Sequence, residues 1–382
     1  MTRTLFSILF IVGHVLGLSP AAWSEEAEES ALRQSVGQKV VVGFFGQKNS
    51  DPDFRRVLKN LEQGIVGGVL FLGRNISNRT DLEIMVRDVK NCKCATTPLI
   101  AIDEEGGVIE RLGETKGFEN TASAAEIGRG SEEKARVAYA QLANKLSELG
   151  FNMNLAPVVD LNVNPTNPII GQLNRSFSRS PQTVSQYASI FIEEHHKHGI
   201  ATALKHFPGH GSSSTDSHDS IVSVEKSWSP VELVPYKNLI GQGIVDCVMV
   251  GHLANASRWG GTATQDRSSA IEQILRQELK FDGVVLSDDL SMKAVRSPTQ
   301  PFSEVIKSSV RAGVDIVIVS RINDDDETTD TGNYANEAIL AGVRAGEIDR
   351  SAMASSVERI EILKKKISEN FASKIQPKKN RN

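Results

Sequence analysis

Eight short apolar runs recur along the chain, and their spacing constrains the fold more than any other feature. Each run is dominated by Val, Ile, Leu and Ala without a clean alternation of polar and apolar residues. This pattern is typical of strands that are covered on both faces. The runs occupy residues 40–45, 66–73, 98–103, 151–161, 201–207, 245–253, 283–290 and 313–320.

Segments with helical spacing lie between these runs, for example at 131–150, 180–199 and 268–281, and a further helix is expected ahead of the first run. Alternating strands and helices imply parallel strands joined by right-handed crossovers. Eight such units predict an α/β protein with a single (β/α)8 TIM-type barrel rather than an open doubly wound sheet. No G-x-G-x-x-G follows the first run, which disfavours a dinucleotide-binding fold.

The N-terminus has the three parts of a secretory signal peptide. A basic residue precedes the apolar run 5–18, and Ala22 and Ser24 have the spacing of a cleavage site. The run is short for a membrane span and is interrupted by His14, although an uncleaved anchor is the alternative. We therefore expect residues 1–24 to be removed and the mature protein to be periplasmic or secreted, with no stable membrane insertion.

Composition limits what the remainder can be. The chain has 382 residues, is 40% hydrophobic and carries a formal net charge of −4, so it can bury a large core and does not suggest nucleic-acid binding. We expect one barrel over residues 25–370 and a solvated basic tail at 371–382. Among the cysteines, Cys247 is expected to be buried, whereas Cys92 and Cys94 could pair in an oxidising compartment.

Ionisable residues stand repeatedly at the ends of the apolar runs. In a (β/α)8 barrel the active site is built from the carboxyl ends of the strands and the loops that follow them. These side chains should therefore gather at one mouth of the barrel. They are Asp103, Asp160, Lys205, His206, His252, Asp288 and Asp289.

The stretch KHFPGHGSSSTDSH, residues 205–218, carries the most chemistry. His206, His210, His218 and Asp216 are all metal-ligand types, which would suit a metal-dependent hydrolase. However, Phe-Pro-Gly between the first two histidines prevents a helix from placing both on one face. The sequence thus favours a site without a metal. A non-catalytic sugar- or peptide-binding barrel stays open as an alternative.

A glycosidase explains these residues better. That chemistry needs a nucleophile or base on one side of the glycosidic bond and an acid on the other. Asp288, at a rigid strand end, suits the nucleophile. Asp216 and His218 lie on a Ser-rich loop, where the carboxylate could orient the imidazole of an acid/base.

The motifs also resemble those of a known family. KHFPGHG followed by DSH, with LSDDLSM downstream and IDEEGG upstream, is similar to family 3 of the glycoside hydrolases, specifically its single-barrel bacterial β-N-acetylglucosaminidases. The resemblance covers roughly residues 35–350. Family 3 β-glucosidases lack the DSH and take their acid from a second domain, for which this chain has no room.

The resemblance implies a role for each matching position. Asp288 matches the catalytic nucleophile, His218 the general acid/base and Asp216 its partner. The implied substrate-binding residues are Asp103, Arg111, Arg175, Lys205 and His206. His252 is a further pocket candidate, and His210 is expected to shape its loop. The chain departs from the family at Val108, where an arginine is usual.

The resemblance therefore implies a retaining exo-β-N-acetylglucosaminidase with no metal and no cofactor. Its expected substrate is a GlcNAc-containing glycan or muropeptide, and the protein is expected to be a monomer. Within the family, the alternatives are an enzyme with another β-glycoside specificity and a phosphorolytic enzyme. A metal-dependent barrel hydrolase is kept as a lower alternative.

Overall fold

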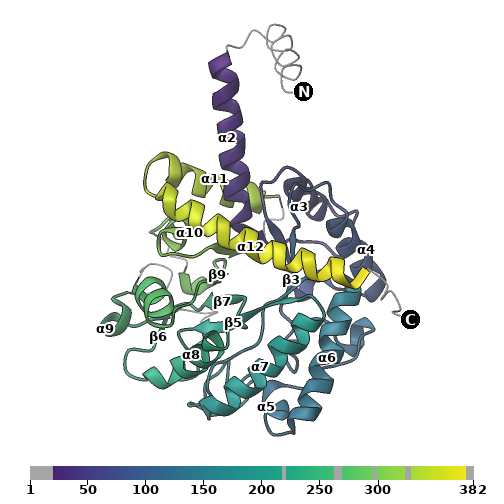
Figure 1. Ribbon diagram of the computed structural model, residues 1–382, viewed down its shortest axis with the longest axis vertical. Helices are drawn as coiled ribbons and strands as arrows, with labels where there is room; N and C mark the ends of the chain where they lie inside the picture. The colour runs from purple at the N-terminus through teal and green to yellow at the C-terminus, as the bar shows by residue number, and fades with distance from the viewer. Residues whose placement is uncertain (1–19, 217–220, 262–268, 296–298, 323–327, 376–382) are drawn as a thin grey trace, which may run out of the picture.

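Eight parallel strands close into a barrel (Figure 1), as the apolar runs predict. The structure is a computed structural model that describes residues 20–216, 221–261, 269–295, 299–322 and 328–375. The first and last strands pair in parallel through Val41 and Ile318, which closes the ring. The barrel strands are β1 Val40–Val42, β2 Gly68–Phe71, β3 Leu99–Ile102, β4 Met153–Asn154, β5 Ala201–Phe207, β7 Cys247–Val250, β9 Val284–Asp289 and β10 Ile316–Val319.

The helices form the outer layer around the strands (Figure 1). The three helical segments taken from the sequence are found as α6 Glu132–Leu149, α7 Pro181–Lys197 and a π-helix at Ser269–Glu278. The others are α2 Pro20–Gln38, α3 Pro52–Glu62, α4 Arg79–Lys90, α5 Ala124–Ile127, α8 Val234–Gly241, α9 Ala256–Trp259, α10 Phe302–Arg311, α11 Thr331–Arg344 and α12 Arg350–Ile375.

Helix α6 shows why these segments end where they do. The Ser131 side chain accepts a hydrogen bond from the backbone N–H of Lys134 at the first turn. Gly150 ends the helix with φ +97°, a left-handed conformation that glycine adopts without steric penalty. The backbone then enters β4, so the cap sets the short helix-to-strand connection.

The core has two layers. Outside the barrel, strand side chains pack against the helices in one large apolar cluster. Inside, apolar side chains fill the barrel, including Val41, Leu70, Ala101 and Met153. A filled interior is typical of this fold and makes the barrel a packed core, not a pore.

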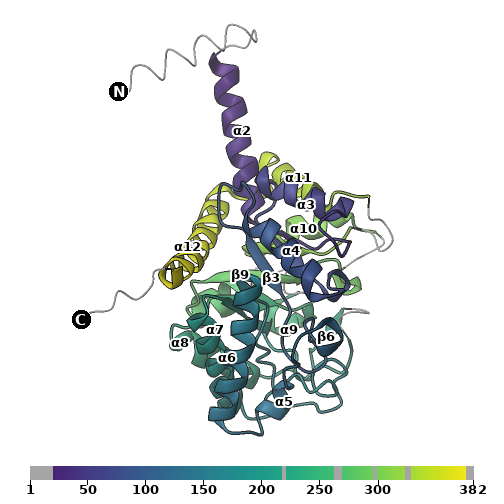
Figure 2. The same ribbon diagram turned by 90° about the vertical axis from the view of Figure 1, so that its right-hand side faces the viewer.

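Helix α12 lies across the amino-terminal ends of the strands (Figure 2). Its Ile360, Leu363 and Ile367 belong to the same apolar cluster as the barrel interior. Lys366 pairs with Asp246, which directly precedes β7. Helix α12 therefore plugs the end of the barrel opposite the mouth.

Helix α2 projects from the body of the barrel, and its carboxyl-terminal part packs beside α11 (Figures 1 and 2). Arg33 of α2 pairs with Glu337 of α11 at 2.5 Å. Among the described helices, none is both long and apolar enough to cross a membrane. Residues 1–19 and 376–382 lie outside the described residues, so neither the signal peptide nor the full basic tail is tested.

Two features were left open or unpredicted by the sequence. A small parallel sheet of β6 Val222–Ser223 and β8 Leu253–Ala254 joins the loops that follow β5 and β7. Strands of two residues carry no readable periodicity, so this sheet could not be predicted. Cys92 and Cys94 form a disulfide, and Cys247 is buried as expected.

Candidate active site

A pocket of about 320 Å3 opens at the carboxyl ends of the barrel strands. Its walls come from segments that are far apart in the sequence, and its floor is apolar, made by side chains such as Leu155 and Met249. Charged groups stand above this floor, among them Asp103, Arg111 and Asp288. The strand ends thus bring the predicted residues to one mouth.

Asp288 stands at the end of β9 and is partly buried. Its Oδ1 accepts a hydrogen bond of 2.8 Å from the backbone N–H of Asp289. Burial alone would raise the pKa of Asp288, but the neighbouring His252, His206 and Lys205 outweigh it and lower the pKa to about 2. The carboxylate is therefore ionised near neutral pH, which is the form that a nucleophile needs.

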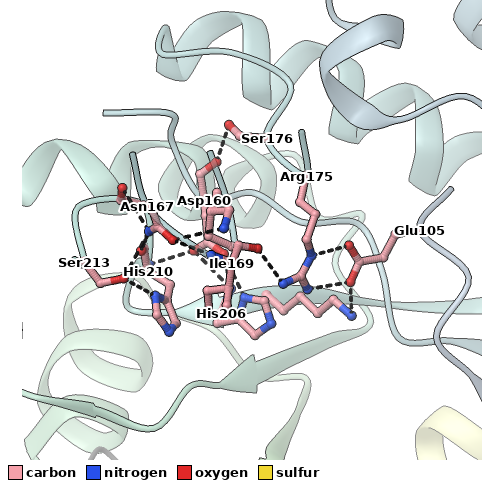
Figure 3. A network of polar contacts seen from close by, with 12 residues as sticks. Glu105, Asp160, Asn167, Ile169, Arg175, Ser176, His206, His210 and Ser213 are labelled. Atoms are coloured by element: carbon pink, nitrogen blue, oxygen red, sulfur yellow. Dashed lines mark hydrogen bonds and ion pairs between the residues drawn. The ribbon is translucent and has the colours of Figure 1, made fainter. Parts of the chain in front are cut away.

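A network of alternating charges, which includes Arg175 and Glu105 (Figure 3), interacts with Asp288 through Lys205. Lys205 Nζ contacts Asp103 Oδ1 at 2.9 Å and Glu105 Oε1 at 2.6 Å. Arg175 holds Glu105 through two hydrogen bonds, of 2.8 Å from Nε and 2.7 Å from Nη2. Arg111 Nη2 lies 3.8 Å from Asp103 Oδ2. Each buried charge therefore has an opposite partner, without which burial would be strongly unfavourable.

The partners fix the protonation states of the network. Burial would raise the pKa of Glu105, but the charges of Arg175 and Lys205 hold it well below its usual range. Burial would lower the pKa of Lys205, but Asp103 and Glu105 raise it. Within the described residues, Arg111 Nε is buried without a hydrogen-bond partner. Fixed donors and acceptors of this kind suit the recognition of sugar hydroxyl groups.

Asp160 organises the histidines that follow β5. Its Oδ2 lies 2.8 Å from His206 Nδ1, and its Oδ1 accepts the backbone N–H groups of His206 at 3.2 Å and His210 at 2.8 Å. Burial would raise the pKa of Asp160, but His206 and His210 lower it. An ionised carboxylate only accepts, so Nδ1 of His206 carries a proton and Nε2 is left for another partner.

The loop after β5 is anchored at its start. His210 Nδ1 lies 2.8 Å from Ser213 Oγ, and its carbonyl oxygen accepts a 2.8 Å hydrogen bond from Asn167 (Figure 3). His210 thus shapes the loop, as its glycine neighbours suggested. Asp216, further along, is partly buried, whereas His218 lies outside the described residues. The proposed contact between these two side chains is therefore not tested.

The comparisons with known proteins agree with this geometry. Residues 31–363 match the glycosyl hydrolase family 3 N terminal domain. The chain belongs to glycosyl hydrolase family 3. This membership makes it a glycoside hydrolase.

Curated relatives named beta-hexosaminidase are similar to this chain over most of their length. Beta-hexosaminidase LpqI of Mycobacterium tuberculosis is 32% identical over 358 residues, which are 90% of this chain and 86% of the relative. The solved structure of M. tuberculosis LpqI has a TM-score of 0.74 and 30% identity, over 92% of this chain and 95% of that chain.

A family 3 β-N-acetylglucosaminidase from Paenibacillus sp. str. FPU-7 has a TM-score of 0.79 and 32% identity. The match covers 88% of this chain but 62% of that chain, so this protein spans less than two thirds of its length.

Asp103, Arg111 and Lys205, which were named from the sequence, lie close together at the mouth, and Arg175 joins them through Glu105. Arg175 donates hydrogen bonds from Nε and Nη2 to Glu105 and from Nη1 to the carbonyl of Ile169, the last at 2.9 Å. Its observed role is thus to hold Glu105, and direct sugar contact stays a prediction. Across the described residues, no three His, Cys, Asp or Glu side chains are grouped to hold a metal ion.

Sequence reasoning missed the roles of three carboxylates of this family 3 site. Glu105 links Lys205 to Arg175, and Asp160 holds His206. The third, Glu104, is fully buried and accepts the backbone N–H of Arg111 at 2.6 Å. Asp160 was visible as a polar strand end, and the glutamates as part of IDEEGG, but no local pattern separates a carboxylate that touches a ligand from one that holds its neighbours.

Proposed function

We propose that the protein is a retaining exo-β-N-acetylglucosaminidase that releases terminal GlcNAc from β-linked substrates. The observation that carries the proposal is the ionised Asp288 carboxylate beside the Lys205 network in a pocket at the barrel mouth. The names of the relatives, β-hexosaminidase and β-N-acetylglucosaminidase, support the choice of sugar. A small pocket fits one terminal residue better than the middle of a polymer.

The first chemical step forms a covalent intermediate. An oxygen of Asp288 attacks the anomeric carbon as the glycosidic bond breaks, and His218 donates its proton to the departing oxygen. Asp216 orients the imidazole and stabilises its charged form. The products are a glycosyl-enzyme ester on Asp288 and the released aglycone.

The second step returns the enzyme to its starting state. His218, now neutral, accepts a proton from water as the water oxygen attacks the anomeric carbon, and the ester bond to Asp288 breaks. Each step inverts the anomeric configuration, so the β-configuration is retained. Histidine suits this exchange because its ordinary pKa lies near neutrality.

The charged network would bind the terminal sugar. Asp103 and Lys205 offer an acceptor and a donor for its hydroxyl groups, and Arg111 Nε is a buried donor without a partner among the described residues. His206 offers Nε2, because its Nδ1 faces Asp160. These contacts orient the anomeric carbon toward Asp288.

We further propose that the protein acts outside the cytoplasm on muropeptides or other GlcNAc-containing fragments. Two features support export, namely the signal-peptide pattern of residues 1–24 and the Cys92–Cys94 disulfide. Structural disulfides persist in oxidising compartments.

Phosphorolysis is the second candidate. A carboxylate acid/base would repel an incoming phosphate, whereas a histidine does not. Cationic side chains also line the pocket, including Arg74, Lys293 and Arg321. Phosphate would then take the place of water in the second step and leave with the sugar.

Assays of the purified mature protein test these proposals. Aryl β-GlcNAc should be cleaved far faster than aryl β-glucoside, and the first sugar product should be β. Added phosphate should leave both the rate and the product unchanged, whereas formation of a sugar phosphate would favour the second candidate.

Asp288→Asn keeps the shape of the side chain but removes the nucleophile, so turnover should collapse on every substrate. Full activity of this variant would refute the mechanism.

A further inference from the structure

Strand β9 ends in two adjacent carboxylates and contains an irregularity at that point. Against β10, Leu286 pairs with Ile316 and Asp289 pairs with Ile318, so β9 advances three residues while β10 advances two. The extra residue is a β-bulge, which lies at Ser287–Asp288. Bulges next to active sites redirect side chains that a regular strand would send to alternate faces.

Asp289 contacts the groups that surround this bulge. Its Oδ1 accepts the backbone N–H groups of Ser291 at 2.9 Å and Ser320 at 3.0 Å. Its own N–H donates to Asp288 Oδ1 at 2.8 Å, and its carbonyl oxygen lies 3.1 Å from His252 Nε2. One residue therefore touches the nucleophile, a neighbouring histidine and the end of β10.

The end of β10 is itself held from two sides. Ser291 Oγ accepts the N–H of Arg321 at 3.0 Å and donates to the Arg321 carbonyl at 2.8 Å. Arg74, which follows β2, donates from Nη2 to the Ser320 carbonyl at 2.9 Å and from Nε to the Phe44 carbonyl at 2.9 Å. The side chain of Asp289 is thus fastened to a fixed part of the mouth.

We propose that Asp289 is a positioning residue that latches β9 to β10 and so aims the carboxylate of Asp288 at the anomeric carbon. The inference deepens the proposed function and rests on it. Asp289 Oδ1 already accepts two backbone N–H groups, whereas the Asp288 carboxylate accepts the N–H of Asp289 and interacts electrostatically with Lys205, His206 and His252. The two carboxylates therefore differ in role.

The two hydrogen bonds that Asp289 Oδ1 accepts require an oxygen acceptor at this position. Both donors reach the same atom, Oδ1, and the amide oxygen of asparagine can accept both. A nucleophile, in contrast, does not survive conversion to an amide. Substitution by asparagine consequently separates the two roles. Substitution by alanine removes both hydrogen bonds of the Asp289 side chain and leaves the Ser320 N–H with Ser291 Oγ alone, at 3.0 Å.

The test compares four variants by steady-state kinetics on aryl β-GlcNAc. Asp289→Ala should lower kcat about 10- to 100-fold with little change in KM, because a small misplacement of a reacting group slows chemistry without weakening sugar contacts. Asp289→Asn should have a kcat close to that of the wild type, while Asp288→Asn should show no turnover. Asp282→Ala is the control, because this exposed aspartate precedes the same strand at its other end.

The outcomes separate the two proposals. An inactive wild-type protein would overturn the function and the latch together. An active wild type labelled covalently on Asp288, with Asp289→Ala equal to it, would overturn the latch alone. If Asp289→Asn is as inactive as Asp288→Asn while both melt like the wild type, Asp289 has a chemical role and the latch is wrong. The asparagine variant also keeps the test valid if the alanine variant fails to fold.

Discussion

Single residues at the mouth are held by partners of opposite charge or by backbone amides. The contacts of Lys205 and Arg175 with Glu105 give each of these buried charges an opposite partner. Pairs of this kind contribute little net stability, but removing one partner is severe, because it leaves the other charge buried alone. The residues of this site are therefore better probed by isosteric changes than by truncation.

The proposed acid/base gives a sharp residue-scale prediction. His218→Ala removes the proton donor and acceptor but leaves Asp288. An aryl leaving group of low pKa departs with little protonation, so the first step should survive on activated substrates. The second step should be slow, because no base activates water. Stopped-flow absorbance should show a burst of released aryl group, and mass spectrometry should show a covalent adduct on Asp288.

Azide provides the control for this variant. Azide needs no base to attack, so it should restore turnover of His218→Ala and give a β-glycosyl azide. Equal loss on activated and unactivated substrates, without an adduct, would show that His218 is not the acid/base.

The buried Glu104 should make the free energy of unfolding depend on pH. It is fully buried, and burial raises its pKa from 4.5 to about 7, in spite of the opposing charge of Lys145. Between these values the folded protein binds a proton that the unfolded chain has lost, so this residue's contribution to stability falls as pH rises from about 4.5 to about 7. Below that window the contribution is independent of pH.

Glu104→Gln should remove the loss of stability that Glu104 causes as the pH rises. Its amide oxygen can still accept the N–H groups of Arg111 and Leu112, and it does not ionise. We expect the variant to gain at most about 3 kcal/mol over the wild type at pH 8 and nothing at pH 4. Urea unfolding at both pH values measures this difference. Glu358→Gln, on an exposed side chain of α12, is the control; an equal gain there would attribute the effect to net charge.

At the element scale, the two ends of the barrel differ in function. Loops after the strands carry the charged site, whereas α12 closes the opposite end with apolar side chains. Lys364 supports this closure, since its Nζ donates to Gln38 Oε1 at 2.6 Å and to the Gly67 carbonyl at 2.9 Å. In barrels of this type the amino-terminal face serves stability.

Leu363→Ala tests this division. Loss of a buried leucine in a packed core should reduce the free energy of unfolding by about 2–5 kcal/mol. The kcat and KM of the folded fraction should not change, because the substitution lies at the end away from the pocket. Ile362→Ala is a matched control, since this neighbouring side chain is 61% exposed. A change in KM for Leu363→Ala at a temperature where it stays folded would argue that the two ends are coupled.

At the scale of the whole molecule, the proposed export makes a prediction about the compartment. Expressed in its host, the protein should be recovered outside the cytoplasm with residues up to about Ser24 removed. Intact-mass analysis of the purified chain measures the cleavage. Cys92 and Cys94 should resist alkylation until a reductant is added. Recovery of full-length chain with free thiols from the cytoplasm would refute the proposal.

The sequence by itself determined the barrel and the place of its site. Strand runs and helix caps are local patterns, and parallel strands necessarily bring their carboxyl ends to one mouth. Asp103, Lys205 and Asp288 end three of these runs, so their positions in the chain suffice to assign them to one site. The family motifs then implied their roles.

The tertiary structure alone decided which charges compensate one another. Arg175 contacts Glu105, which lies 70 positions away in the chain. Helix α12, near the C-terminus, packs against the amino-terminal end of the barrel. The bulge at Ser287–Asp288 depends on the register of β9 against β10. Burying a charge is costly unless an opposite charge or hydrogen-bond partners lie within a few ångströms. For Arg175 and Glu105 that distance is set by the packing of distant segments, not by neighbours in sequence.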